Sequence, residues 1–345
     1  MMLKTKRKRL TNNDPLLTES YDYILPDELI ATHPVSPRDH AKLLVFNRKN
    51  NKIIHTRFDK INDFLPQNAA IIFNNTKVIK ARIYGQKSTG GKVELLINRP
   101  LNSYEINVYI RGKVKEKSLL NFDHGISAEI VAIHNDGSRT VSFYQNNALL
   151  SFESLIPLLD LIGHIPLPPY LGREDNSDDE KEYQSVFALN QAVAAPTASL
   201  HFTEELFKKV CSTHNHAFVT LHVGAGTFKP VEAKIITDHP MHSEYFYIND
   251  DAVKIINSNQ PIVCIGTTST RTIEFYARTN LLEGEANLFL HPNNLPIRVN
   301  HLLTNFHLPQ STLLMLVASF IGLEKTQEIY QEAIKEKYRF FSYGD

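Results

Sequence analysis

The segment PIVCIGTTSTRTIEFYAR, residues 261–278, decides the fold class of this chain. Its first half is a short apolar run that ends in glycine and hydroxyl residues, as a buried strand does before a turn. Its second half, from residue 270, predicts a helix. The same alternation surrounds it, because a helix from Thr203 precedes the predicted strand 217–226, and a helix over 250–259 precedes this segment. Alternating strands and helices predict a layered α/β domain with a largely parallel sheet.

Residues 68–147 follow a different pattern. Five or so short strands are separated by Gly, Asn, Asp and Ser turns, with no convincing helix between them, which predicts a small antiparallel β-barrel. We therefore expect an α/β domain of residues 21–67 and 148–345, with a barrel domain of residues 68–147 inserted into it. Residues 1–20 are expected to be a basic, disordered extension. The acidic segment 173–183 is expected to be an exposed loop.

Composition sets limits on function. The 345 residues include 37 basic and 37 acidic side chains, so any contact with nucleic acid must come from a local patch. The two cysteines, Cys211 and Cys264, are too far apart in sequence for a metal knuckle or a redox pair, which favours free thiols in a reducing compartment. The longest apolar stretch, 313–323, is shorter than the roughly 18 residues of a membrane span.

The candidate ligand-binding residues lie where predicted strands end, the edge at which open α/β sheets bind ligands. Two glycines and a threonine follow His222, and a cluster of hydroxyl residues with one arginine begins the helix after residue 266. Free amides at such a helix start favour an anion or a polar ligand. Among the 15 histidines, His201 and His222 stand out because each adjoins a turn of small residues. The ligand candidates are Pro196, Thr197, Gly224, Gly226, Thr227, Thr267, Thr268, Ser269, Arg271, Asn305 and His307.

Two other kinds of chemistry are disfavoured. The clusters DHPMHSE, with His239, His242 and Glu244, and THNH, with His214 and His216, lack the helical spacing of zinc hydrolases, so no metal is predicted. Ser199 and Thr197 have no G-x-S-x-G elbow around them, which disfavours covalent acyl chemistry.

Several segments together resemble one protein family. They are GGKVELLI, HIPLPPYL, EYQSVFA, AVAAPTASLHFT, VTLHVGAGTFKPV, DHPMHSEYF, GTTSTRTIE, TNFHLPQSTLLMLVASFIG and KYRFFSYGD, in order from about Tyr21 to Asp345. This set resembles the S-adenosylmethionine:tRNA ribosyltransferase-isomerases of queuosine biosynthesis. The chain departs from the family pattern at Ser199, where glycine is usual. If that position needed a positive φ, serine would fit poorly.

The resemblance implies a transferase with an α/β domain and an inserted barrel. Its substrates would be S-adenosylmethionine and a tRNA with a GUN anticodon that carries 7-aminomethyl-7-deazaguanine at the wobble position. The products would be epoxyqueuosine-tRNA, adenine and methionine. The resemblance implies a cytoplasmic enzyme, expected to be a monomer, with no cofactor beyond the co-substrate and no metal. The alternatives are a non-catalytic RNA- or nucleoside-binding module and a tRNA methyltransferase that uses the same donor.

This reaction assigns expected roles to residues. A base with a near-neutral pKa suits removal of the proton beside the sulfonium, so His201 or His222 is expected to give acid–base help, with Glu244 orienting one of them. A purely structural role for His201 stays open. The Gly224–Thr227 and Thr267–Arg271 turns are expected to hold the donor, with Arg271 pairing its carboxylate. The expected tRNA contacts are Lys77, Lys80, Arg82, Lys92 and Arg111.

Overall fold

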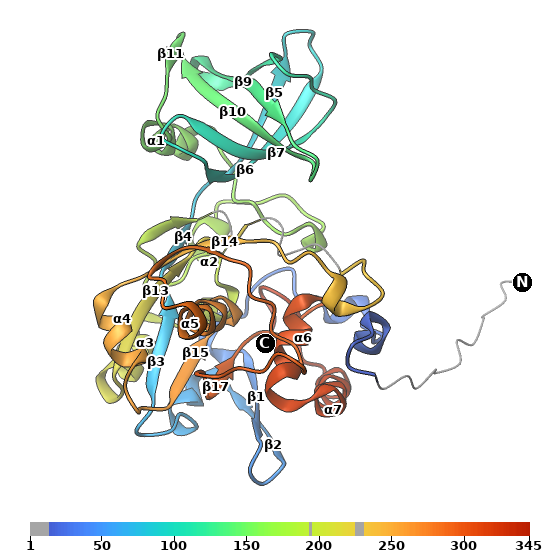
Figure 1. The fold of residues 1–345 in the computed structure, drawn as a ribbon, viewed down its shortest axis with the longest axis vertical. Coiled ribbons are helices and arrows are strands. Elements are labelled where there is room, and N and C mark those ends of the chain that lie inside the picture. The colour runs from blue at the N-terminus through green and yellow to red at the C-terminus, as the bar shows by residue number, and fades with distance from the viewer. Residues whose placement is uncertain (1–13, 193–194, 225–230) are drawn as a thin grey trace, which may run out of the picture.

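The computed structural model describes residues 14–192, 195–224 and 231–345. A six-stranded sheet in the order β16-β14-β13-β3-β15-β17 forms the centre of the larger domain (Figure 1). Its four adjacent strands β13, β3, β15 and β17 run parallel to one another. At one edge, β14 pairs antiparallel with β13, and β16 pairs antiparallel with β14. The bounds are β3 Ala70–Asn74, β13 His216–Leu221, β14 Glu244–Ile248, β15 Ile262–Ile265, β16 Glu283–Ala286 and β17 His301–Leu303. The predicted α/β class is confirmed.

Helices cover both faces of this sheet. On one face α4 and α5 pack against Ile72, Leu221 and Cys264, and on the other face α3 packs against residues that include Phe73. Cys264 is fully buried, as expected for an inert thiol, and burial raises its pKa far above the usual range. The helices are α3 Glu204–Thr213, α4 Asp250–Ile256, α5 Thr267–Thr279, α6 Thr312–Ile321 and α7 Leu323–Lys335.

The barrel is closed. The strands follow the order β10-β7-β6-β5-β8-β9, and β9 pairs again with β10, so six antiparallel strands form a ring to which β11 adds a short edge. Its apolar interior is capped by α1, through Leu155 and Leu159. The bounds are β5 Arg82–Lys87, β6 Lys92–Pro100, β7 Glu105–Arg111, β8 Leu119–Asn121, β9 Ile126–Ile133, β10 Ser138–Gln145, β11 Ala148–Leu149 and α1 Phe152–Ile162.

The barrel segment differs from the expected range of 68–147 at both ends. Strand β3 belongs to the central sheet, because all five of its residues are buried and its Ile71 and Phe73 pack on one face while Ile72 packs on the other. A strand buried on both faces shows a continuous apolar run, which the sequence alone does not distinguish from a barrel strand. At the other end, α1 belongs to the barrel because its apolar side completes the barrel core.

Between the two domains, β4 (Thr76–Val78) pairs in parallel with β12 (Asn190–Ala192). The strands β1 (Lys42–Asn47) and β2 (Lys52–Arg57) form an antiparallel hairpin. A short helix, α2 (Asp179–Glu182), lies in the acidic segment for which the sequence predicts an exposed loop. That expectation is wrong at Asp179, which is 1 % exposed and accepts two hydrogen bonds from Arg173 and one from Tyr343.

Residues 14–20, expected to be part of a disordered extension, are folded. The 3₁₀ turn Thr18–Tyr21 contains the buried side chains of Thr18 and Ser20, and the Thr18 amide donates to the Lys234 carbonyl at 3.1 Å. The rest of that expected extension, residues 1–13, lies outside the described residues. In the part of the chain that the structure describes, no helix is long and apolar enough to cross a membrane.

Candidate functional site

A cavity lies at the carboxyl ends of the parallel strands, where the sequence predicts a ligand site. Val223 follows β13, Gly266 follows β15, and Thr304 with Asn305 follows β17. The 3₁₀ turn Thr197–His201 closes another side. Segments that are far apart in sequence therefore meet at one edge of the sheet, which is the ligand-binding edge of open α/β sheets.

The structure divides the predicted ligand residues into two groups. Those that line the cavity are Pro196, Thr197, Thr267, Thr268, Asn305 and His307. Those described but absent from its lining are Gly224, Ser269 and Arg271. Gly226 and Thr227 lie outside the described residues. None of the three side chains proposed for catalysis, His201, His222 and Glu244, lines the cavity in the described part of the chain.

The turn into α5 supplies one wall. Gly266 has φ +92° and ψ 156°, a backbone conformation that is essentially restricted to glycine. The first amides of α5 have no partner within the helix, so this end of the helix favours negative charge. The Ser269 hydroxyl donates to the Ile265 carbonyl at 2.8 Å and is therefore occupied within the helix. The buried Oγ1 of Thr268 has no hydrogen-bond partner in the described structure.

Asn305 forms a second wall and connects it to His201. The Thr197 hydroxyl donates to Oδ1 of Asn305 at 2.9 Å, and Nδ2 of Asn305 lies 3.2 Å from Nε2 of His201. The His201 ring packs on Phe58 with centroids 4.9 Å apart, and it also has a hydrogen bond to the Arg38 backbone. Burial lowers the pKa of His201 to about 4, so this ring is neutral at pH 7. The arrangement supports the structural alternative for His201.

His307 is also neutral. Its Nε2 lies 2.8 Å from the Thr304 hydroxyl, and its backbone amide donates to the Tyr330 hydroxyl at 3.0 Å. Burial lowers the pKa of His307 to about 3. A histidine of this kind positions its neighbours through hydrogen bonds and does not carry a proton at neutral pH.

Arg271, which is expected to pair the donor's carboxylate, is absent from the described lining of the cavity. Its guanidinium is buried and donates to Oε2 of Glu244 at 2.5 Å and to the Ala286 carbonyl at 3.3 Å. The other carboxylate oxygen of Glu244 accepts the Gly224 amide at 3.1 Å. One guanidinium nitrogen of Arg271 bonds to Glu244, whose other oxygen accepts from Gly224, so Arg271 holds the turn after β13 against α5.

His222 lies at the edge of the site. Its amide donates to the Tyr245 carbonyl at 2.9 Å, and the two rings are 5.8 Å apart. His222 is half-buried and directly precedes Val223, which lines the cavity. The other two side chains proposed for catalysis, His201 and Glu244, are buried.

The aromatic side of the cavity is not predicted from the sequence. Tyr170, Phe306 and Phe341 line it together with Ser342. Phe341 has φ +72°, an uncommon conformation for a bulky residue. The motifs HIPLPPYL and KYRFFSYGD contain Tyr170 and Phe341. They give no local signal for a ligand site, because the two residues meet only through the tertiary fold.

Ser199 fits its position. It lies in the 3₁₀ turn Thr197–His201 and is absent from the described residues with positive φ, so the backbone there does not require glycine. Its side chain is fully buried and its hydroxyl has no partner in the described structure.

The expected tRNA contacts differ in how free their charges are. Arg82 pairs with Glu94 at 3.1 Å, and Lys80 pairs with Glu180 at 2.7 Å. Arg111 also lies near Glu94, at 3.8 Å, but its side chain is 89 % exposed. Lys77 and Lys92 are exposed as well. The last three are therefore better placed to meet phosphates. Over the described residues, no group of three or more His, Cys, Asp or Glu is arranged to hold a metal ion.

Comparison with known proteins identifies relatives along nearly the whole chain. The family model described as "Queuosine biosynthesis protein" matches residues 18–345. An S-adenosylmethionine:tRNA ribosyltransferase-isomerase from Sulfurimonas denitrificans is 59% identical over 97% of this chain and 98% of its own, and one from Nitratiruptor sp. is 58% identical over 96% and 98%. A crystal structure of an S-adenosylmethionine tRNA ribosyltransferase from Thermotoga maritima shares 33% identity, covers 94% of this chain and 98% of that one, and has a TM-score of 0.52. These findings confirm the resemblance seen in the sequence.

Proposed function

This chain belongs to the queuosine biosynthesis protein family, and from that premise we propose that it is an S-adenosylmethionine:tRNA ribosyltransferase-isomerase. It transfers and isomerises the ribosyl moiety of S-adenosylmethionine onto 7-aminomethyl-7-deazaguanine at the tRNA wobble position. The products are epoxyqueuosine-tRNA, adenine and methionine. The observation that carries the proposal is the 59% identity to a protein of that name over 97% of the chain.

The cavity supports the proposal as the donor site. It lies at the carboxyl edge of the parallel strands and combines aromatic residues with hydroxyl and amide groups. The free amides at the start of α5 suit the donor's carboxylate, in place of Arg271. The donor is the co-substrate, and the proposal uses no metal.

The reaction needs a proton to leave the carbon next to the sulfonium, and His222 is our candidate for the base. It is half-buried beside the cavity wall, whereas His201 is buried behind that wall and bonded to Asn305. Glu244 acts as a positioning residue, because its carboxylate joins the Gly224 amide to Arg271.

The acceptor in this proposal is a tRNA with a GUN anticodon, bound through the exposed basic residues Lys77, Lys92 and Arg111. The protein acts as a monomer in the cytoplasm. Selection among tRNAs with different anticodons tests the acceptor, and light scattering tests the assembly state.

The deciding experiment identifies what becomes of the donor. The purified protein is incubated with S-adenosylmethionine and tRNA that carries the modified base, and the spent donor is separated by chromatography. We expect adenine and methionine, released only when the tRNA is present. S-adenosylhomocysteine would instead mean a methyltransferase, and an unchanged donor would mean a binding module.

A further inference from the structure

The aromatic side of the cavity is built from three distant parts of the chain. The rings of Tyr170 and Phe341 lie with centroids 4.6 Å apart, and the Phe341 amide donates to the Phe306 carbonyl at 3.1 Å. The Tyr170 hydroxyl bonds to the Ser342 hydroxyl and accepts the Ser342 amide at 3.3 Å. These contacts fix both rings before any ligand arrives.

Phe341 occupies this wall despite its backbone. A φ of +72° is strained for a residue with a large side chain. Strained residues persist only where the surrounding structure holds them, and they are concentrated at ligand sites. Here the hydrogen bond from Phe341 to Phe306 and one from the Gly344 amide to the Phe341 carbonyl at 2.9 Å keep the ring in the cavity wall.

The polar side of the cavity carries no net charge. Its described lining contains no Lys, Arg, Asp or Glu, and His307 is neutral at pH 7. Asn305 uses one lone pair of Oδ1 for Thr197 and one hydrogen of Nδ2 for His201. An amide has two lone pairs and two hydrogens, so Asn305 keeps one acceptor and one donor position.

We propose that this end of the cavity is a subsite for an uncharged purine-type ring, which stacks on Phe341 beside the tilted ring of Tyr170 while its edge pairs with the Asn305 amide. An adjacent donor and acceptor is the edge that such rings present, and asparagine pairs with adenine in this way. The inference rests on the proposed function, which supplies two possible sources of the ring. One is the adenine of the donor, and the other is the 7-deazaguanine of the tRNA.

The test measures ring binding by calorimetry, without catalysis. Adenine and 7-aminomethyl-7-deazaguanine are titrated separately into the full chain. We expect one of them to bind, and its identity names the source of the ring. If neither base binds a protein that binds S-adenosylmethionine, the proposal is overturned.

Variants then test the two contacts. Phe341→Leu keeps an apolar side chain but removes the ring, and should weaken binding of the base about five-fold or more, since a stacked base contributes through its π-face. Phe122→Leu makes the same change in the separate apolar core of the barrel and should leave base binding within about two-fold of the unaltered protein. Equal affinities in both variants and the unaltered protein would contradict the stacking wall.

The Asn305 contact is tested from the ligand side. If adenine is the bound base, unsubstituted purine, which lacks the 6-amino donor, should bind the unaltered protein about ten-fold more weakly than adenine. That difference should disappear in Asn305→Ala, because the partner of the amino group is gone. For the deazaguanine arm, the matched ligand is its analogue without the 6-oxo group. A difference that persists in the variant would overturn the assignment of Asn305.

Failure of this subsite is distinguishable from failure of the proposed function. Tight base binding that depends on Phe341 and Asn305, in a protein that releases no adenine from its donor, would keep the subsite and reject the activity. If the protein releases adenine from its donor but no variant alters base binding, the activity is kept and the subsite is rejected.

Discussion

At the scale of single residues, Asn305 is the point where buried polar chemistry meets the cavity. It accepts from Thr197 and contacts His201, whose ring packs on Phe58. The side chain of His201 therefore fixes which way the Asn305 amide faces. Removing one member of such a buried chain leaves the others without partners, which costs more than the bond itself contributes.

His201 should be replaceable by a residue that accepts a hydrogen bond. We expect His201→Ala to lose about 1–3 kcal/mol of unfolding free energy through the unpaired Asn305 amide. His201→Gln should recover most of this loss, because its carbonyl can accept from Nδ2. Denaturant unfolding and single-turnover adenine release of both variants check the expectation.

An acid–base role predicts a different result for the same pair. It requires turnover to fall about 100-fold or more in His201→Gln as well as in His201→Ala, with the donor still bound. That outcome would refute a positioning role.

The two buried histidines should make stability depend on pH in the weakly acidic range. Burial lowers the pKa of His201 to about 4 and of His307 to about 3, against 6.5 when unfolded. Below pH 6.5 the unfolded chain therefore binds more protons than the folded protein. The free energy of unfolding should decrease as the pH is lowered, by up to about 1.4 kcal/mol per pH unit for each histidine. Urea unfolding between about pH 7.5 and 5 measures the slope. His201→Gln should flatten it, and an identical slope in the variant would contradict the burial argument.

At the scale of elements, the sequence predicts what has a local pattern. The apolar run and the hydroxyl turn of residues 261–278 predict the β15–α5 unit, which the structure contains. The same reasoning places β3 wrongly in the barrel, because five consecutive buried residues carry no alternation. Tyr170 and Phe341 escape prediction for another reason, since their contact depends on how distant segments are folded together.

The buried pair between β14 and α5 gives a prediction at this scale. Glu244→Leu or Arg271→Met alone should cost about 3–5 kcal/mol of stability, because each leaves a buried partner without its counter-charge. Replacing both, as Glu244→Leu with Arg271→Met, should cost less than either single change. Denaturant unfolding of the three variants tests the coupling, and additive losses would show that the pair is not coupled.

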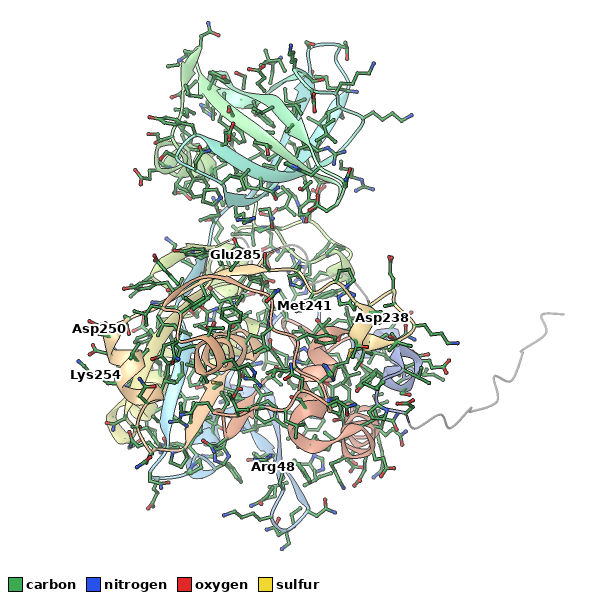
Figure 2. The ribbon with its side chains drawn as sticks, in the orientation of Figure 1. Arg48, Asp238, Met241, Asp250, Lys254 and Glu285 are labelled. Atoms are coloured by element: carbon green, nitrogen blue, oxygen red, sulfur yellow. The ribbon has the colours of Figure 1, made fainter. Side chains whose placement is uncertain are left out.

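At the scale of the whole molecule, the barrel contacts the larger domain through polar groups. Arg99 at the end of β6 pairs with Glu285 of β16 at 2.7 Å, and Figure 2 shows Glu285 on the side of the larger domain that is turned toward the barrel. Lys80, between β4 and β5, pairs with Glu180 of α2. Asn98 lies so close to Gly224 that a β-carbon there would be 3.1 Å from its Oδ1. The barrel thus contacts the turn that leads from β13 to the site.

The exposed basic residues Lys77 of β4 and Lys92 and Arg111 of the barrel should provide much of the tRNA affinity. We expect the triple variant Lys77→Glu, Lys92→Glu, Arg111→Glu to bind tRNA more weakly. Its salt dependence should be shallower by about 0.7–0.9 in log–log slope for each phosphate that the variant no longer neutralises. Lys49→Glu with Lys52→Glu is a control with two reversed charges, at the hairpin turn far from the barrel (Figure 1). Filter binding at several salt concentrations measures both, and equal slopes would exclude this surface.

The insertion of the barrel between β3 and β13 affects how the chain is made. These strands pair side by side in the finished sheet, yet β13 leaves the ribosome roughly 140 residues after β3, on the order of 10 s later. During that interval β3, whose residues are all buried in the folded protein, has none of its sheet neighbours. The barrel has all six of its strands by then and can close first. The larger domain, which contains the site, is therefore the last part of the molecule to form.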